Sequence, residues 1–435
     1  MGGLTASIRL AHLGYAVTVF EARSSAGGLA SSFEVGGLRF DAGPYVLLDR
    51  PGLDWAFQRL GLDLGSEIPL VRIEEIYDVR FESGRQVQIY GDRHRSAEAM
   101  EKSWPGSAKR YLGFVGELEI VHRSVQPLQY VATPGWRSLV RTGAVRHAPF
   151  LMRGLRSALR RSGLASEIVD ALSIWTHIAR QSLDEAPSLL ALVPALIHTV
   201  GAFYPRGGIG VIPSRLAEEA ETLGVTFRFD TKVGKLRFDT RPAVVVDGEL
   251  LEFDAIVSNA GGVGTYLELC DPTPPGAERL RELALQSPGR CTYLSMASPE
   301  APYLRFYLGP EGCEVLAQPS LVDKTQIRAG RHPARLISAE AVAIDESWWT
   351  DMAKCRKTLA VRMPSDWGKE FHLYQNSMNP VMTARLARRG RLRHRSPNVK
   401  GLYLVGSSTH PGQWVSFCAI SGILGAEAVH EDFAG

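Results

Sequence analysis

The apolar and polar positions along the chain predict a helix and then a short strand at its amino end. Residues 1–14 carry apolar side chains at helical spacing behind two glycines, and residues 15–20 form an apolar run that ends at Glu21. A helix that opens on glycines, followed by a strand that ends in an acid, is typical of the second half of a dinucleotide-binding βαβ unit. In such a unit the helix N–H groups face a pyrophosphate, and the acid binds ribose hydroxyls.

The first strand of this unit, with the first two glycines of the G-x-G-x-x-G pattern, would precede Met1. The sequence therefore predicts a unit truncated at its first strand, with Gly2 and Gly3 as the tail of the phosphate-binding turn. Loss of a central strand would leave strand edges unpaired. A chain with a flavin-type fold that no longer binds cofactor therefore remains an alternative.

The remaining periodicity alternates between strands and helices, which favours an α/β fold. The segments with strand patterns are 31–41 and 77–90 (two hairpins), 224–233, 243–249, 253–260, 292–297, 305–308, 315–317, 334–339 and 401–406. The segments with helical spacing are 54–64, most of 96–204, 211–220, a tryptophan-containing stretch near 345–349, and 418–429.

Composition is ordinary for a folded globular protein, with 45% hydrophobic and 22% charged residues and a net charge of +3. The five cysteines are scattered without C-x-x-C pairing, which argues against a disulfide framework or a metal site and fits a reducing cytoplasm. No secretory signal is visible. The longest apolar stretch, residues 189–203, is interrupted by Pro194 and His198 and is too short for a membrane span.

Charge is distributed unevenly, because no acidic residue lies between Glu119 and Glu167 while eight arginines fall between Arg123 and Arg161. Interspersed apolar residues make this 123–161 region a candidate for contact with anionic lipid headgroups. A solvated arginine face explains the composition equally well. A nucleic-acid patch is disfavoured, since aromatic interleaving and a nucleic-acid module are both lacking.

Four sequence blocks carry a resemblance to a known family. They are E-A-R-x-x-x-G-G at 21–28, F-D-x-G-P at 40–44, Y-P-x-G-G at 204–208, and G-L-Y-L-V-G-x-x-T-H-P-G at 401–412. With them, the chain resembles the phytoene desaturase-like family (carotenoid desaturases and isomerases) of FAD-dependent oxidoreductases, within the amine oxidase superfamily. The resemblance implies a Rossmann-type FAD-binding domain of residues 1–75, 205–262 and 396–435. It also implies an α+β substrate domain of residues 76–204 and 263–395, with an antiparallel sheet and a helical lid.

The resemblance implies FAD as cofactor and also implies its contacts. The residues so implicated are Gly2, Gly3, Glu21, Ala22, Arg23, Gly27, Gly28, Leu29, Gly43, Pro44, Val233, Gly406, Gly412, Gln413, Trp414 and Val415. One departure from the family stands out. Small residues and a G-I-P step commonly follow H-P-G in the family, whereas residues 413–417 here read Q-W-V-S-F. A tryptophan at the flavin edge would reshape the cavity and allow a substrate other than long linear phytoene.

Removing hydrogen from an unactivated carbon chain requires a strong hydride acceptor, which side chains cannot supply and a flavin can. Few catalytic side chains are therefore expected; His410 is a candidate proton donor, or a loop residue that bonds only to backbone. The resemblance implies desaturation or isomerisation of a polyene isoprenoid by a cytoplasmic, peripherally membrane-bound enzyme, with a quinone or oxygen as electron acceptor. The alternatives are a saturase or other oxidoreductase of a retinoid or other lipid. An amine oxidase is disfavoured because no amine-binding aromatic cage is marked.

Overall fold

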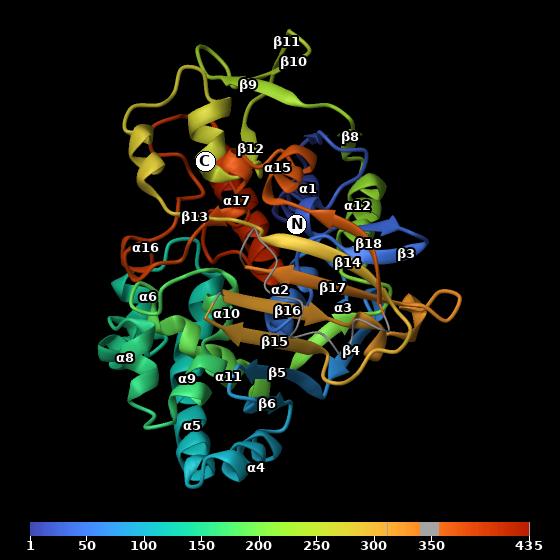
Figure 1. Ribbon diagram of the computed structural model, residues 1–435. Coiled ribbons are helices and arrows are strands. Elements are labelled where there is room, and N and C mark those ends of the chain that lie inside the picture. Colours follow the sequence, from blue (N-terminus) through green and yellow to red (C-terminus); the bar gives the residue numbers. More distant parts are fainter. Residues whose placement is uncertain (311, 340–355, 435) are drawn as a thin grey trace.

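The computed structural model describes residues 1–310, 312–339 and 356–434, so the helix predicted near 345–349 lies outside the described residues. A seven-stranded sheet lies across the middle of the molecule and can be followed in Figure 1. The first and last helices pack together on one side of it, and the helices of residues 93–199 lie on the other. The predicted α/β class is confirmed. The proposed domain boundaries remain a prediction.

The end of the molecule that holds the first and last helices is built from short parallel strand pairs and three helices. Strand β1 pairs with β8, and β12 pairs with β20. The elements are α1 (Gly2–His12), β1 (Thr18–Phe20), α12 (Val211–Thr222), β8 (Thr226–Arg228), β12 (Ile256–Ser258), β20 (Leu402–Leu404) and α17 (Val415–Phe433). Among the described strands, β1 and β12 have no second partner.

Helices α1 and α17 lie directly against each other. The Thr5 hydroxyl donates a 2.8 Å hydrogen bond to the carbonyl oxygen of Ala419, across the contact. Gly422 makes this close approach possible. A Cβ at that position would overlap the carbonyl oxygen of Gly2 and the hydroxyl of Thr5. The amino-terminal turn of α1 is thereby held in place by the last helix of the chain.

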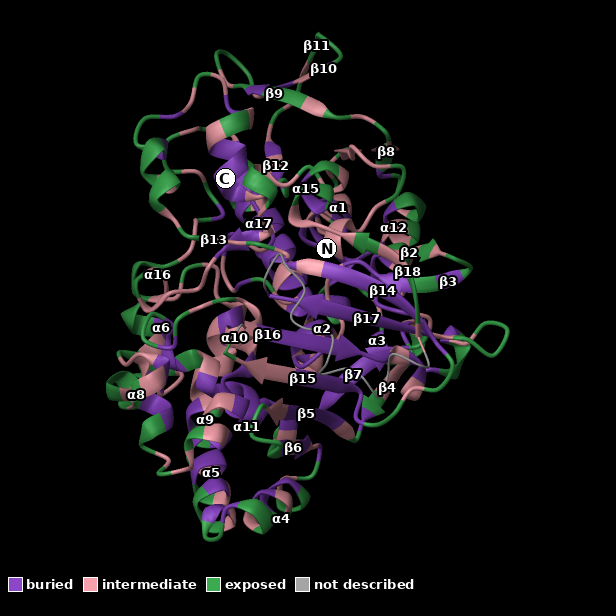
Figure 2. Cartoon of the chain, viewed as in Figure 1, coloured by how far each residue is buried: buried purple, intermediate pink, exposed green. Residues whose placement is uncertain are grey.

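The seven-stranded sheet has the order β18-β14-β17-β16-β15-β5-β6 and is antiparallel except where β15 runs parallel to β5. Its strands are β5 (Glu75–Phe81), β6 (Gln86–Tyr90), β14 (Arg290–Met296), β15 (Leu304–Gly309), β16 (Gly312–Ala317), β17 (His332–Ser338) and β18 (Arg356–Arg362). Figure 2 shows that its central strands are buried. The predicted antiparallel sheet is confirmed, with one parallel neighbour that the local pattern did not indicate.

Helices fill most of the stretch from residue 93 to residue 199, as predicted. They are α4 (Arg93–Ser103), α5 (Ser107–Val125), α6 (Trp136–Arg141), α7 (Ala148–Leu151), α8 (Leu155–Arg160), α9 (Ser166–Leu172), α10 (Ile174–Ile178), the 3-10 helix η4 (Ser188–Leu192) and α11 (Val193–Thr199). The helical stretch ends earlier than predicted. Gly201 has a φ of 106°, and the chain then enters strand β7 (Ala202–Pro205).

Smaller elements connect these parts. Both predicted hairpins are confirmed, as β2–β3 and β5–β6. The elements still to be named are β2 (Ser32–Val35), β3 (Leu38–Asp41), α2 (Arg50–Arg59), α3 (Leu64–Glu67), β4 (Leu70–Ile73), β9 (Val233–Arg237), β10 (Ala243–Val246), β11 (Glu249–Glu252), α13 (Gly262–Gly264), β13 (Leu285–Gln286), α15 (Pro364–Glu370), β19 (Asn379–Pro380) and α16 (Ala384–Arg389). Strand β4 pairs with β7, and β13 pairs with β19.

Candidate functional site

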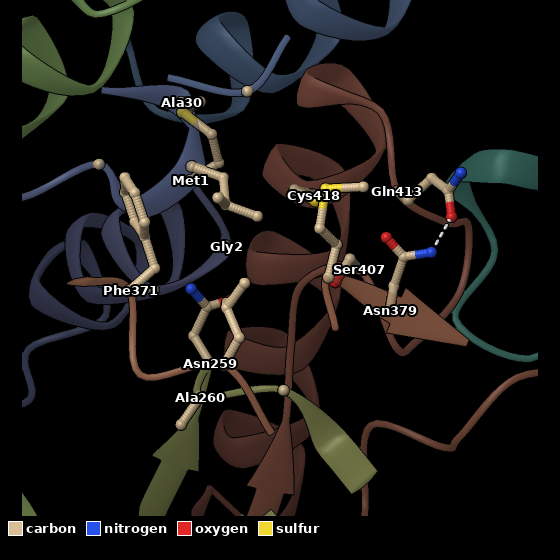
Figure 3. A pocket seen from close by; sticks show the side chains of 18 of the residues that line it. Met1, Gly2, Ala30, Asn259, Ala260, Phe371, Asn379, Ser407, Gln413 and Cys418 are labelled. Atoms are coloured by element: carbon tan, nitrogen blue, oxygen red, sulfur yellow. Dashed lines mark hydrogen bonds between the residues drawn. The ribbon is translucent and has the colours of Figure 1, made fainter. Parts of the chain in front are cut away.

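A cavity of about 1410 Å³ runs from the amino end of α1 toward the helices of residues 93–199. Strands β1 and β12 and the start of α17 line one part of it. Trp175, Ile178, Leu190 and Val193 line another. Figure 3 shows this cavity closely, with Met1, Gly2, Asn259 and Cys418 around it. The volume exceeds the usual 300–1,000 Å³ of small-molecule pockets, so the cavity can hold more than one ligand.

The first turn of α1 presents an anion-binding end to the cavity. Gly2 and Gly3 line it, and the helix has neither a capping side chain nor an acidic residue in its first turn. Unpaired N–H groups and the helix dipole therefore favour a negative ligand there. A side chain on Gly2 would approach Asn259 Oδ1 to 2.8 Å and the Gly406 nitrogen to 2.9 Å. The position therefore requires glycine.

The acid and the Gly-Gly turn predicted after β1 both lie at the cavity. Glu21 Oε1 accepts a 3.0 Å hydrogen bond from the Arg23 backbone N–H. The Arg23 guanidinium donates to Ser31 Oγ at 3.1 Å and so ties the turn to the next strand. Gly27 has a φ of 117°, and a Cβ there would meet Pro213 at 3.0 Å. Only glycine fits this close and left-handed backbone.

The loop from Asp41 to Pro44 is fixed by a buried arginine that the sequence did not point to. Arg335 of β17 donates from Nη1 to the carbonyl oxygens of Asp41 and Ala42, at 2.6 and 2.7 Å. From Nη2 it donates to the carbonyl oxygen of Gly43 at 2.7 Å. The central sheet thus holds the F-D-x-G-P loop against the cavity.

The carboxylate of Asp41 is the second anchor of this loop. It accepts hydrogen bonds from the Tyr204 hydroxyl at 2.6 Å, the Ile209 N–H at 2.8 Å and the Ser32 hydroxyl at 2.9 Å. Burial raises the pKa of this carboxyl above its usual range. Asp41 therefore joins two of the blocks recognised in the sequence, F-D-x-G-P and Y-P-x-G-G.

The loop before α17 brings Gln413, Trp414 and Val415 to the cavity wall. The Trp414 ring stacks on Phe417, with ring centroids 4.9 Å apart and planes 12° from parallel. The two departures from the family motif thus support each other, and the tryptophan contributes a rigid wall to the cavity.

Most of the residues implicated from the sequence come together at this one cavity. Those that line it are Gly2, Gly3, Glu21, Ala22, Arg23, Gly27, Gly28, Leu29, Gly43, Pro44, Val233, Gln413, Trp414 and Val415. Gly406 and Gly412 are not part of the lining. Gly406 packs behind Gly2, and its N–H donates to Ser421 Oγ at 2.8 Å.

His410, the candidate proton donor, does not line the cavity. Its Nε2 donates a 2.9 Å hydrogen bond to the carbonyl oxygen of Leu128. Burial lowers the pKa of the imidazole to about 4, so the ring is neutral at neutral pH. The structure therefore places this histidine between the H-P-G loop and the helical part, where it joins two segments.

This burial gives a pH dependence that can be measured. The unfolded chain protonates His410 near pH 6.5 and the folded chain only near pH 4, so the unfolded state binds more protons in between and stability falls as pH falls. We expect acidification across this window to destabilise the wild type by about 3 kcal/mol more than His410→Gln. Urea unfolding at several pH values measures this difference, and parallel losses in both proteins would contradict it.

Several cavity residues were not among the site residues predicted from the sequence. Asn259 follows β12, Asp49 caps α2, and Gln286 and Asn379 lie on the two-residue strands β13 and β19. The Asp49 position shows the usual spacing of an N-cap, since its carboxylate accepts from the Gly52 N–H. The two short strands are too brief for any periodicity to be detected.

A helix end without a cap, an acid after β1, a Gly-Gly turn and a large cavity between them are the features of a dinucleotide-binding site. The family model for flavin containing amine oxidoreductases matches residues 1–297, more than half of the chain, and the chain belongs to this family. FAD is the cofactor. The resemblance to phytoene desaturases is thereby confirmed in its cofactor and superfamily.

Curated relatives agree with this assignment. The zeta-carotene-forming phytoene desaturase of Myxococcus xanthus is 26% identical over 98% of this chain and 92% of its own length. The phytoene desaturase of Cercospora nicotianae is 24% identical over 100% of this chain and 88% of its own. Among solved structures, putrescine oxidase bound to putrescine has a TM-score of 0.69 at 15% identity, covering 100% of this chain and 97% of its own, which shows a shared fold.

Proposed function

We propose that this chain desaturates or isomerises a polyene isoprenoid of the carotenoid type, with FAD as hydride acceptor. The observation that carries the proposal is the continuity of the cavity. At one end it has the glycine-rich elements described above, and at the other it has apolar side chains of α10, η4 and α11. A long apolar substrate can therefore reach a cofactor without leaving the protein. The names of the desaturase relatives support this substrate class.

The geometry supports a proposed set of residues that would hold FAD. The amino end of α1 suits the pyrophosphate, and Glu21 suits ribose hydroxyls. The loop held by Arg335 and the segment 413–415 would face the remainder of the cofactor. Bound FAD supplies the hydride acceptor that side chains lack. The apolar walls keep water away and hold the substrate in one orientation. Oxygen or a quinone is the proposed final electron acceptor.

Anaerobic reduction of the cofactor tests this function. If the chain desaturates its substrate, FAD-loaded protein mixed with detergent-dispersed phytoene or lycopene should lose the flavin's visible absorbance band, because the hydride stays on the flavin when no acceptor is present. If it isomerises the substrate, the band persists and only the geometry of the polyene changes. The polyene product should differ from its substrate in double-bond number or geometry. Bleaching by putrescine or another amine, with no bleaching by polyenes, would contradict the proposal. Turnover of a retinoid or another lipid alone would replace the carotenoid substrate with that class.

The surface around α6 and α7 is the proposed membrane contact. It exposes four apolar side chains, Trp136 (71% exposed), Met152 (60%), Val140 (53%) and Val145 (49%). Exposed arginines lie beside them at positions 137, 141 and 146. Figure 2 shows α6 largely exposed at the edge of the molecule. Apolar side chains among arginines suit the boundary between anionic headgroups and acyl chains. No helix within the described ranges is long and apolar enough to cross a bilayer.

Vesicle binding tests this surface. The double substitution Trp136→Ser and Val140→Ser should weaken co-sedimentation with phosphatidylserine-containing vesicles by about tenfold, because two apolar side chains no longer enter the headgroup region. Leu250→Ser is the matched control, since Leu250 is also more than half exposed but lies on β11 outside the proposed surface. Equal binding by all three proteins would argue against a membrane role for this surface.

A further inference from the structure

Three carboxamide side chains meet on the wall of the cavity. Asn379 Nδ2 donates to Gln286 Oε1 at 3.1 Å and also to Gln413 Oε1. Gln413 Nε2 donates to Gln286 Oε1 at 3.4 Å. All three side chains line the cavity, and Figure 3 shows Asn379 and Gln413 facing each other. We call these three residues, which come from β13, β19 and the loop before α17, the amide triad.

The amide triad has hydrogen-bonding groups that its internal contacts leave unused. Nδ2 of Asn379 serves the two glutamine oxygens and, at 3.2 Å, the Pro380 carbonyl oxygen, and these acceptors fix the orientation of the amide. Its Oδ1 therefore points away from them, as Figure 3 shows. Among the described residues, neither Asn379 Oδ1 nor Gln286 Nε2 has a partner. Both residues line the cavity, so these two groups are available to a ligand there.

The amide triad is linked through the chain after Asn379 to the helical part of the molecule. The segment after Asn379 is bonded to the chain that follows α10. Gln181 Nε2 donates to the Met382 carbonyl oxygen at 2.5 Å, and the Ala384 N–H donates to the Glu185 carbonyl oxygen at 2.6 Å. Residues of α10 form the apolar wall of the cavity, so the triad borders the space proposed for the substrate. Gln413 adjoins Trp414 at the start of α17, so the triad is also next to the proposed cofactor contacts.

We propose that the amide triad binds a hydroxyl group of the substrate, which makes the substrate class a hydroxylated polyene. A hydroxyl can donate to Asn379 Oδ1 and accept from Gln286 Nε2, and so it matches both unused groups. A pure hydrocarbon would bury these amides without partners, and a site built to hydrogen-bond a hydroxyl discriminates against the analogue that lacks it. This inference rests on the proposed polyene function and adds the chemistry of the substrate's polar group.

Ligand binding, measured apart from turnover, tests the inference. Lycopene and its 1-hydroxy-1,2-dihydro derivative are titrated into FAD-loaded protein, and quenching of tryptophan fluorescence gives each dissociation constant. The hydroxylated polyene should bind about tenfold more tightly, as two added hydrogen bonds imply. Asn379→Leu should reduce that ratio to near one. Asn398→Leu, which alters an exposed asparagine outside the cavity lining, should keep the tenfold ratio.

Each of the remaining results either overturns or keeps the inferred binding of a hydroxyl group. Equal affinity of the wild type for both polyenes, or no binding of the hydroxylated one, overturns the inference. The inference is also overturned if Asn379→Leu loses FAD but keeps the tenfold ratio of the two dissociation constants, because the amides would then belong to the cofactor site. If that variant does not fold, Gln286→Leu on the same short ladder should show the same fall in ratio. A tenfold ratio with neither flavin bleaching nor any change in the double-bond number or geometry of either polyene would keep the inference and refute the proposed reaction.

Discussion

Replacing Gly422 with alanine is expected to remove FAD from the protein and to lower its stability by about 3 kcal/mol. The new methyl group would overlap the Gly2 carbonyl oxygen and the Thr5 hydroxyl and would stand 3.0 Å from the Ala6 nitrogen. Two of these three contacts are with backbone atoms, which cannot rotate away. Helix α1 must therefore move off α17, and its first turn would no longer face the cavity.

Urea unfolding and flavin retention after gel filtration measure the two effects of Gly422→Ala. Gly113→Ala is the matched control, because a Cβ at this glycine in α5 would meet no atom within 4 Å. That control should gain roughly 0.5–1 kcal/mol from the reduced freedom of the unfolded chain and should keep its flavin. If Gly422→Ala also retained flavin at wild-type stability, the close contact of α1 and α17 would not be what holds the cofactor turn.

Arg335→Met is the second substitution with a large expected effect, a loss of about 4 kcal/mol in stability together with weaker FAD binding. Arg335 is 4% exposed, and its guanidinium donates to three consecutive carbonyl oxygens of the Asp41–Gly43 loop. A methionine fills much of the same space but leaves those oxygens buried without donors. The loop would then be free to leave the central sheet.

Two comparisons separate this local effect from loss of charge. Arg335→Lys keeps the charge but cannot reach three oxygens with a planar fork, so its stability should fall between those of the wild type and Arg335→Met. Arg241→Met removes an exposed arginine paired with Asp254 and should change stability by less than about 0.5 kcal/mol. Wild-type flavin affinity in Arg335→Met would show that the loop is held by other contacts.

The sequence predicted those parts of the site in which one residue type is required by backbone geometry. Gly27 and Gly2 are examples, because a side chain at either would collide with neighbouring atoms. The acid after β1 was predictable for a related reason, since strand periodicity fixes where β1 ends. Such local requirements place particular residue types at fixed spacings in the sequence. The same kind of local pattern located both hairpins.

Other parts of the site depend on contacts between distant segments and produce no recognisable pattern in the sequence. Asn379 and Gln286 meet although they are 93 residues apart, on strands of two residues each. Arg335 lies in a strand that is buried along nearly its whole length, and only the assembled fold brings it to the Asp41 loop. His410 was considered for chemistry because of its motif, but its partner is a carbonyl 282 residues away.

The contact between α1 and α17 also dictates when the protein can become functional. Thr5 and Ala419 are 414 residues apart, and Asp78 and Arg305, which pair across two neighbouring strands of the central sheet, are 227 apart. Such distant pairings form slowly, and the first helix emerges from the ribosome long before its partner is made. Until then its apolar side is exposed and its glycine turn has no fixed orientation. We therefore expect cofactor loading to follow translation, once α17 has packed against α1.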